Sequence, residues 1–110
     1  IRHKAVDILQ PDIAWCGGVS TCLKICGAAD AAGMNVILHG GGNTVYGQHF
    51  SFATACVPWL ECFVGTDPGV PLEEGWGIPG QALPKDGFLV PSDAPGFGFE
   101  ISEDWLEPFV

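Results

Sequence analysis

Three short apolar runs alternate with two helix-length segments in the first 64 residues, and this alternation limits the possible folds more than any other feature. The runs cover residues 6–9, 35–39 and 59–64. Helical spacing predicts a helix over residues 21–32, stopped by a glycine, and a weaker helix from 45 or 48 to 55. Strands and helices that alternate with short connections are typical of parallel βαβ units, so the sequence predicts an α/β fold.

Three polar residues, Asp12, His39 and Glu61, accompany the three predicted strands. Asp12 follows the first run, His39 ends the second, and Glu61 lies within the third. Because the strands of a parallel sheet or barrel point the same way, residues at their carboxyl ends meet at one edge. We therefore expect the three side chains to lie close together and to form a general acid/base set.

His39 is the candidate acid or base, because a strand fixes it directly before the glycines at 40–42. Glycine lets the backbone turn closely beneath a ligand, and imidazole is suited to proton transfer near neutral pH. Asp12 could hold the tautomer of His39, and Glu61 could donate to a developing oxyanion. The structural alternatives are a hydrogen-bonded core histidine, an aspartate in a turn after a proline, and a glutamate in a buried ion pair.

The charge and composition of the chain exclude several classes of partner. Thirteen Asp and Glu against four Lys and Arg give a net charge of -9, so binding to nucleic acid or to an acidic membrane surface is not expected. The sequence has no run of about eighteen apolar residues and no basic leader, and it predicts neither a membrane span nor a signal peptide. Five cysteines without a regular framework indicate reduced thiols in a cytoplasmic protein.

The composition changes after the third predicted strand, where Gly, Pro and acidic residues become frequent. Asp86-Gly87 before the apolar residues 88–90 predicts a turn that leads into a short strand. The many Phe and Trp residues of this loop-rich tail, residues 65–110, predict that it packs on a larger body. Because Ile1 rather than Met opens the chain, we expect it to begin within a longer protein.

Four segments carry a resemblance to a known family. They are residues 7–18 (DILQPDIAWCGG), 38–40 (LHG), 58–61 (PWLE) and 94–98 (APGFG). Together they resemble the C-terminal third of the enolase superfamily and, within its mandelate racemase-like branch, the L-rhamnonate dehydratases.

The resemblance implies a fold and a division of the chain. Residues 1–64 would be the last three β/α units of a TIM-type (β/α) barrel, which is incomplete here. Residues 65–110 would be a C-terminal tail that packs back on the barrel and on a capping domain outside this chain. The N-terminal region of the same protein would then be a partner of this chain, and a homo-oligomer is expected by analogy with other such barrels.

The resemblance also implies roles for the site residues. His39 would be the base that removes the proton α to a carboxylate and the acid that assists departure of the 3-hydroxyl, with Asp12 as its dyad partner. Glu61 would hydrogen-bond the enediolate or the substrate carboxylate, and Gly40 would lie beside them in the binding site. An essential Mg²⁺ would neutralise the enediolate. Its ligands are expected on three earlier strands, so none is expected in this chain.

The implied activity is the dehydration of an aldonic acid, a small sugar acid, to a 2-keto-3-deoxy acid. A racemase or epimerase of the same superfamily is an alternative, and it would need a second base on the opposite face of the substrate. A small acidic α/β module that binds a partner without chemistry is another, and a large separation between Asp12 and His39 would favour it. In either enzyme we expect these 110 residues alone to be catalytically silent.

Overall fold

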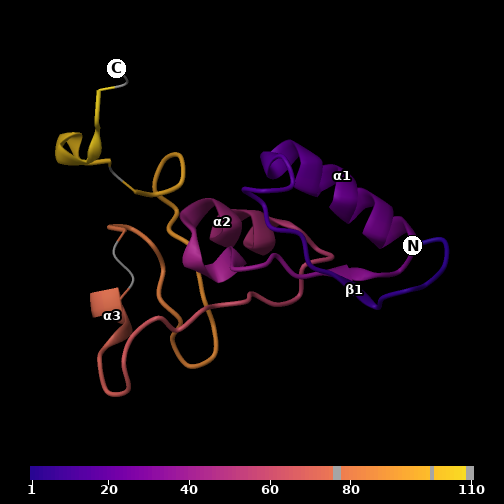
Figure 1. The fold of residues 1–110 in the computed structure, drawn as a ribbon, viewed down its shortest axis with the longest axis horizontal. Coiled ribbons are helices and arrows are strands. Elements are labelled where there is room, and N and C mark those ends of the chain that lie inside the picture. Colours follow the sequence, from indigo (N-terminus) through magenta and orange to yellow (C-terminus); the bar gives the residue numbers. More distant parts are fainter. Residues whose placement is uncertain (76–77, 100, 109–110) are drawn as a thin grey trace.

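The computed structural model describes residues 1–75, 78–99 and 101–108. Two short parallel strands, β1 (Ile8–Leu9) and β2 (Asn35–Val36), are connected by the helix α1 (Gly18–Ala31), which packs beside them (Figure 1). A strand, a crossover helix and a parallel strand form one βαβ unit. This unit confirms the first half of the alternation that the sequence predicts.

The pairing of the two strands continues past their ends. Leu9 lies opposite Val36 in the parallel register. The N–H of Ile37 donates to the carbonyl oxygen of Leu9 at 2.9 Å, and the N–H of His39 donates to that of Pro11 at 3.0 Å. The two predicted strands are therefore in the right place and direction, although only two residues of each have regular strand geometry. These bonds bring the chain at the end of β1 next to His39.

Helix α1 begins three residues before its predicted start at 21 and ends one residue before its predicted end at 32. Its N-cap is Gly17, which has a φ of 112° that glycine adopts readily, and no side chain caps it. At the other end Gly33 has a φ of 67° and donates its N–H to Asp30, while Met34 donates to Ala29, both at 2.9 Å. These two bonds form a Schellman motif, which confirms the predicted glycine stop.

The glycine run leads into the second helix. Gly41–Asn43 form the 3-10 turn η1, and α2 (Val45–Ala53) follows it. Thr44 is the N-cap of α2, and its hydroxyl oxygen accepts the N–H of Gly47 at 3.2 Å, which satisfies one of the free donors at the helix start. The helix ends two residues before its predicted end at 55.

The predicted third strand, residues 59–64, is wrong, because the structure assigns no strand there. This segment runs past η1 as irregular chain. The N–H of Gly42 donates to the carbonyl oxygen of Glu61 at 2.8 Å, and the backbone of Phe63 bonds to the side chain of Asn43. A strand needs a neighbouring segment that offers regularly spaced backbone N–H and C=O groups, whereas the segment beside residues 59–64 is the turn η1. The described residues therefore form a small α/β fragment rather than three complete barrel units.

The hydrophobic core lies between α1, the sheet and α2. Cys22 and Cys26, which are four residues apart, face it from α1 as small apolar side chains. All five cysteines are free thiols. The buried apolar residues of the core are Ile13, Cys22, Cys26, Ala29, Val36, Leu38, Phe50, Cys56 and Val57.

The tail is mostly irregular in its described part and contains α3 (Leu72–Gly75) and the 3-10 turn η2 (Glu103–Trp105). The turn predicted at residues 86–87 is present. Lys85 and Phe88 on either side of it exchange two backbone hydrogen bonds of 2.8 and 2.9 Å. The strand that was expected to follow is reduced to this single bridge.

The buried side chain of Gln48 joins the tail to the turn η1. Gln48 on α2 is only 1% exposed, and its Nε2 donates to the carbonyl oxygens of Gly42 at 2.7 Å and Ala82 at 2.9 Å. Its Oε1 accepts the N–H of Ala82 at 3.1 Å. Further along the tail, the ring of Phe97 packs on His49 with centroids 5.8 Å apart. The tail thus packs on α2 at two places.

The molecule is more open than a self-contained domain of its length. Its radius of gyration is 15.6 Å and its accessible surface is 7855 Å², against about 13 Å and about 5,800 Å² for a compact chain of this size. Large apolar side chains face solvent, among them Trp15, which is 90% exposed. Extensive apolar exposure of this kind is typical of a surface that other protein covers.

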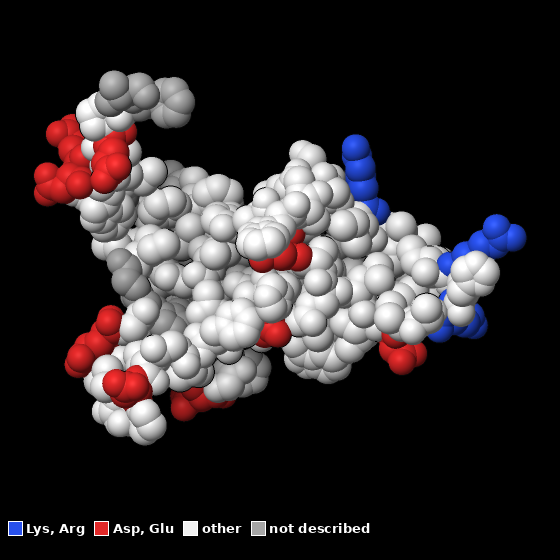
Figure 2. All heavy atoms as spheres, viewed as in Figure 1, with Lys and Arg blue, Asp and Glu red and all other residues white. Residues whose placement is uncertain are grey.

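The charges are unevenly distributed over the surface. On the face seen in Figure 2, most acidic side chains lie toward the end of the molecule that holds α3, and the basic ones lie toward the N-terminus. No helix in the described part of the chain is both long and apolar enough to cross a membrane.

We predict that the buried thiols make the fold sensitive to alkali. Burial and the neighbouring Cys16 thiol raise the pKa of Cys22 to about 12, and burial and Cys56 raise the pKa of Cys26 to about 12, from 9.0 in each case. Because the folded state holds these protons more tightly, their contribution to stability is complete below pH 9 and is lost as the pH rises toward 12. Thermal unfolding midpoints measured across this range should fall.

The control for this prediction is Cys22→Ala, which removes one of the two thiols. The midpoint of this variant should decline less between pH 9 and 12 than that of the unmodified protein. Identical declines in the two proteins would contradict the conclusion that the buried Cys22 thiol causes part of the loss of stability at high pH.

Candidate active site

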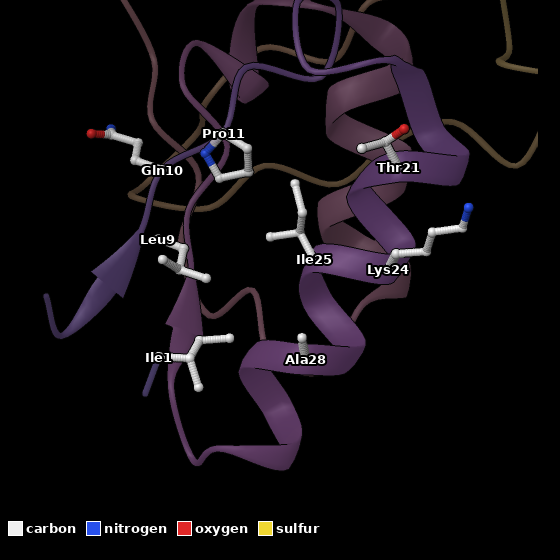
Figure 3. Close-up of a pocket in the computed structure, with 8 residues that line it drawn as sticks. All are labelled: Ile1, Leu9, Gln10, Pro11, Thr21, Lys24, Ile25 and Ala28. Atoms are coloured by element: carbon white, nitrogen blue, oxygen red, sulfur yellow. The ribbon is translucent and has the colours of Figure 1, made fainter. Parts of the chain in front are cut away.

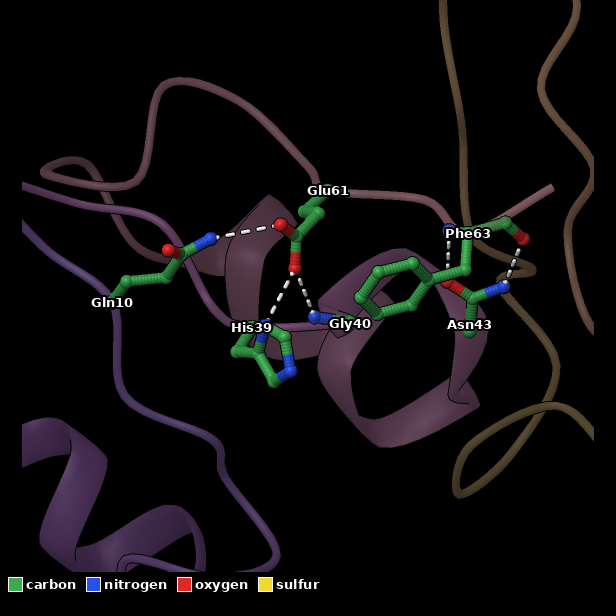
Figure 4. Close-up of polar contacts among 6 residues, drawn as sticks. All are labelled: Gln10, His39, Gly40, Asn43, Glu61 and Phe63. Carbon is green, nitrogen blue, oxygen red and sulfur yellow. Dashed lines mark hydrogen bonds and ion pairs between the residues drawn. The ribbon is translucent and has the colours of Figure 1, made fainter.

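The structure brings two of the three predicted site residues together. Nδ1 of His39 lies 3.0 Å from Oε2 of Glu61 (Figure 4). His39 follows β2, whereas Glu61 comes from the irregular segment 59–64. Their side chains are 51% and 30% exposed, so the pair is partly shielded by protein and still open to a ligand.

The Glu61 carboxylate accepts two further hydrogen bonds. Its Oε2 accepts the backbone N–H of Gly40 at 2.6 Å, and its Oε1 accepts Nε2 of Gln10 at 2.9 Å. An ionised carboxylate is an acceptor only, and hydrogen bonds to it are short and strong. Glu61 therefore selects the tautomer of His39 in which Nδ1 carries the hydrogen.

Asp12 makes no ion pair with His39 within the part of the chain that the structure describes. Its Oδ1 accepts the backbone N–H of Ala14 at 2.8 Å and that of Trp15 at 3.1 Å. An aspartate bonded to the N–H groups two and three residues later closes a turn. The predicted contact between Asp12 and His39 is therefore not formed, and Glu61 is the carboxylate that contacts the imidazole.

The glycines allow the segment that carries Glu61 to pass directly over the turn after His39. Gly40 has a φ of 59°, and a Cβ there would lie 3.2 Å from the ring of Phe63. A Cβ on Gly42 would lie 2.9 Å from the carbonyl oxygen of Glu61 and would overlap the thiol of Cys62. A close approach is present at these glycines, but the neighbour is the chain itself, and the approach to a ligand that the sequence predicts stays a prediction.

The geometry defines what His39 can do chemically. With Nδ1–H donated to Glu61, the neutral ring has its lone pair on Nε2, which can accept a proton from a ligand and later return it. The carboxylate stabilises the imidazolium that forms in between. Phe63 packs edge-on against the imidazole, with ring centroids 5.3 Å apart and an interplanar angle of 79°.

Sequence reasoning missed Gln10, Asn43 and Phe63, which all support the pair. The sequence did contain a signal for Gln10. Side chains two apart on an extended chain share a face, so Gln10 would lie on the same face as Asp12, the candidate site residue. Asn43 lies beyond the glycines, and Phe63 resembles any apolar residue of a predicted strand. Nothing in the sequence separates these two from structural residues.

No group of three or more His, Cys, Asp or Glu side chains in residues 1–75, 78–99 and 101–108 could hold a metal ion. The described residues therefore do not fit the Mg²⁺ that the resemblance implies. A hollow of about 620 Å³ lies between α1 and the end of β1, and is lined mainly by apolar side chains such as Leu9 and Ile25 (Figure 3). Neither His39 nor Glu61 lines this hollow, although Gln10, which donates to Glu61, does.

Comparison with known proteins agrees with the resemblance seen in the sequence. Residues 1–105 match the family described as enolase C-terminal domain-like. The chain is also 35% identical over 107 residues to a protein of Caldivirga maquilingensis named "Putative L-rhamnonate dehydratase", and the match covers 94% of this chain and 26% of that protein. No solved structure matches the chain.

The chain therefore belongs to the enolase C-terminal domain-like family. This confirms the family that the sequence motifs indicated. The chain spans about a quarter of the length of the relative from Caldivirga maquilingensis.

We predict that Gly42→Ala destabilises the protein and displaces Glu61, because the added Cβ overlaps the Cys62 thiol and crowds the Glu61 carbonyl. Overpacking of this kind typically costs about 1–3 kcal/mol. The measurement is the free energy of unfolding from denaturant titration. Gly27→Ala on α1 is the matched control, since the added Cβ would meet nothing within 4 Å. Because alanine is favoured over glycine inside a helix, this variant should stabilise the protein by about 0.5–1 kcal/mol. Equal stabilities for the two variants would contradict the close approach at Gly42.

Proposed function

We propose that the full-length protein that contains this chain dehydrates an aldonic acid, L-rhamnonate or a close relative, to a 2-keto-3-deoxy acid. The observation that carries the proposal is the contact between Nδ1 of His39 and Oε2 of Glu61 at 3.0 Å, which leaves Nε2 as a base on the segment that follows β2. The name of the relative from Caldivirga maquilingensis supports the choice of substrate class.

In the proposed reaction Nε2 of His39 takes the proton on the carbon next to the substrate carboxylate. The electrons of that C–H bond form the double bond of an enediolate. They then expel the 3-hydroxyl group, which leaves as water with the proton returned by the imidazolium. The resulting enol becomes the 2-keto acid, so the net change is the loss of one water molecule. General acid/base transfer of this kind typically contributes about 10²–10⁴-fold to a rate.

Glu61 contributes to this reaction through His39. Its carboxylate fixes the ring orientation and offsets the positive charge that the ring gains on taking the proton. Both carboxylate oxygens already accept hydrogen bonds from Gln10, Gly40 and His39. For this reason we assign to Glu61 the positioning of the base, in place of the direct bond to the enediolate that the resemblance implies.

The proposal includes Mg²⁺ as a group held by residues outside this chain, since the described residues offer no ligand set. No step assigned to His39 or Glu61 depends on its position. A homo-oligomer and a cytoplasmic location are parts of the same proposal that concern the whole protein.

We predict that His39→Ala in the full-length protein lowers kcat for dehydration by about 10²–10⁴-fold, because the variant lacks the base. The measurement is release of 2-keto-3-deoxy acid from a panel of aldonic acids that includes L-rhamnonate. His3→Ala, at an exposed histidine near the start of the chain, is the control and should retain full activity. Unchanged turnover in His39→Ala would overturn the proposal, and a product that keeps all its hydroxyl groups would indicate an epimerase instead.

A further inference from the structure

The segment that carries Glu61 and Phe63 has no strand ladder to hold it, yet both side chains contact His39. Glu61 bonds to the imidazole at 3.0 Å, and the Phe63 ring packs on it with centroids 5.3 Å apart. The position of His39 therefore depends on what fixes residues 61–63. One fixed point is the bond from the N–H of Gly42 to the carbonyl oxygen of Glu61 at 2.8 Å.

Asn43 supplies the second fixed point. Its Nδ2 donates to the carbonyl oxygen of Phe63 at 2.9 Å, and its Oδ1 accepts the N–H of Phe63 at 2.7 Å (Figure 4). A side-chain amide has one donor group and one acceptor oxygen in a plane, as a peptide unit does. The Asn43 side chain thus makes the two hydrogen bonds that a neighbouring strand would make in a sheet, and both are directed to Phe63.

Two consecutive residues of η1, Gly42 and Asn43, thereby hold two alternate residues of the irregular segment. Residues 61 and 63 both have their backbones fixed. The carboxylate of Glu61 is then held where it reaches Nδ1 of His39 and the N–H of Gly40.

We propose that Asn43 is a positioning residue for His39, which acts through Glu61 and Phe63 without touching the substrate. The inference rests on the proposed function for its catalytic consequence, whereas its structural consequence does not depend on that function. Removing the Asn43 amide frees both backbone groups of Phe63, loosens the carboxylate at Nδ1, and lets the imidazole change its tautomer and orientation.

The test uses Asn43→Ala in the full-length protein labelled with ¹⁵N-histidine. NMR of the imidazole nitrogens reports which nitrogen carries the hydrogen, and the signals of His39 are assigned by their loss in His39→Gln. The unmodified protein should show hydrogen on Nδ1, and Asn43→Ala should move the signals toward the Nε2–H form. Its kcat should fall about 10–100-fold with little change in KM, as expected when a reacting group is misplaced by about 1 Å.

Two further variants make the test decisive. Asn35→Ala, at an exposed asparagine on β2, is the matched control and should change neither the imidazole signals nor kcat. Asn43→Asp keeps the size of the side chain and the acceptor for the Phe63 N–H, but it loses the donor and turns a carboxylate toward the Phe63 carbonyl. It should therefore move the His39 signals in the same direction, and it serves as the readout if Asn43→Ala does not fold.

His39 signals and kcat that are unchanged in both Asn43 variants would overturn the inference. If the signals move while no aldonic acid is dehydrated by the unmodified protein, the proposed function fails and the positioning role of Asn43 stands.

Discussion

The Glu61 carboxylate is the point at which separate parts of the chain meet, because it accepts hydrogen bonds from Gln10 after β1 and from His39 and Gly40 after β2. Each of these donors lies where an extended segment ends. A carboxylate with several donors fixes their relative positions, and here it also decides which nitrogen of His39 is the base. The arrangement of the candidate site thus depends on the Glu61 carboxylate as the common hydrogen-bond acceptor.

The parts of the fold that depend on local chemistry could be predicted from the sequence. Gly33 stops α1 because only a residue tolerant of positive φ can close the Schellman motif. The parallel pairing of β1 and β2 follows from two apolar runs joined by a helix. At the glycines after His39 the absence of a side chain allows a close approach of the chain to itself, whereas the expected approach to a ligand stays a prediction.

The parts that depend on long-range contacts could not be predicted. Residues 59–64 have the composition of a buried strand, yet their backbone partners are Gly42 and a side-chain amide, so no ladder forms. Asp12 and Glu61 were both expected to lie near His39, but only Glu61 contacts the imidazole, and the sequence could not decide between the two carboxylates. The turn at residues 12–15 decides which carboxylate contacts the imidazole, because the N–H groups of Ala14 and Trp15 donate to the Asp12 carboxylate.

The most direct test is the carboxylate at Nδ1 of His39 in a crystal structure of the full-length protein with an aldonic acid bound. We predict that Glu61 lies there at about 2.7–3.2 Å, with Asp12 bonded to the backbone N–H groups of Ala14 and Trp15 and with Nε2 of His39 facing the carbon next to the substrate carboxylate. Asp12 at Nδ1, with Glu61 turned away from the imidazole, would contradict the central role of Glu61.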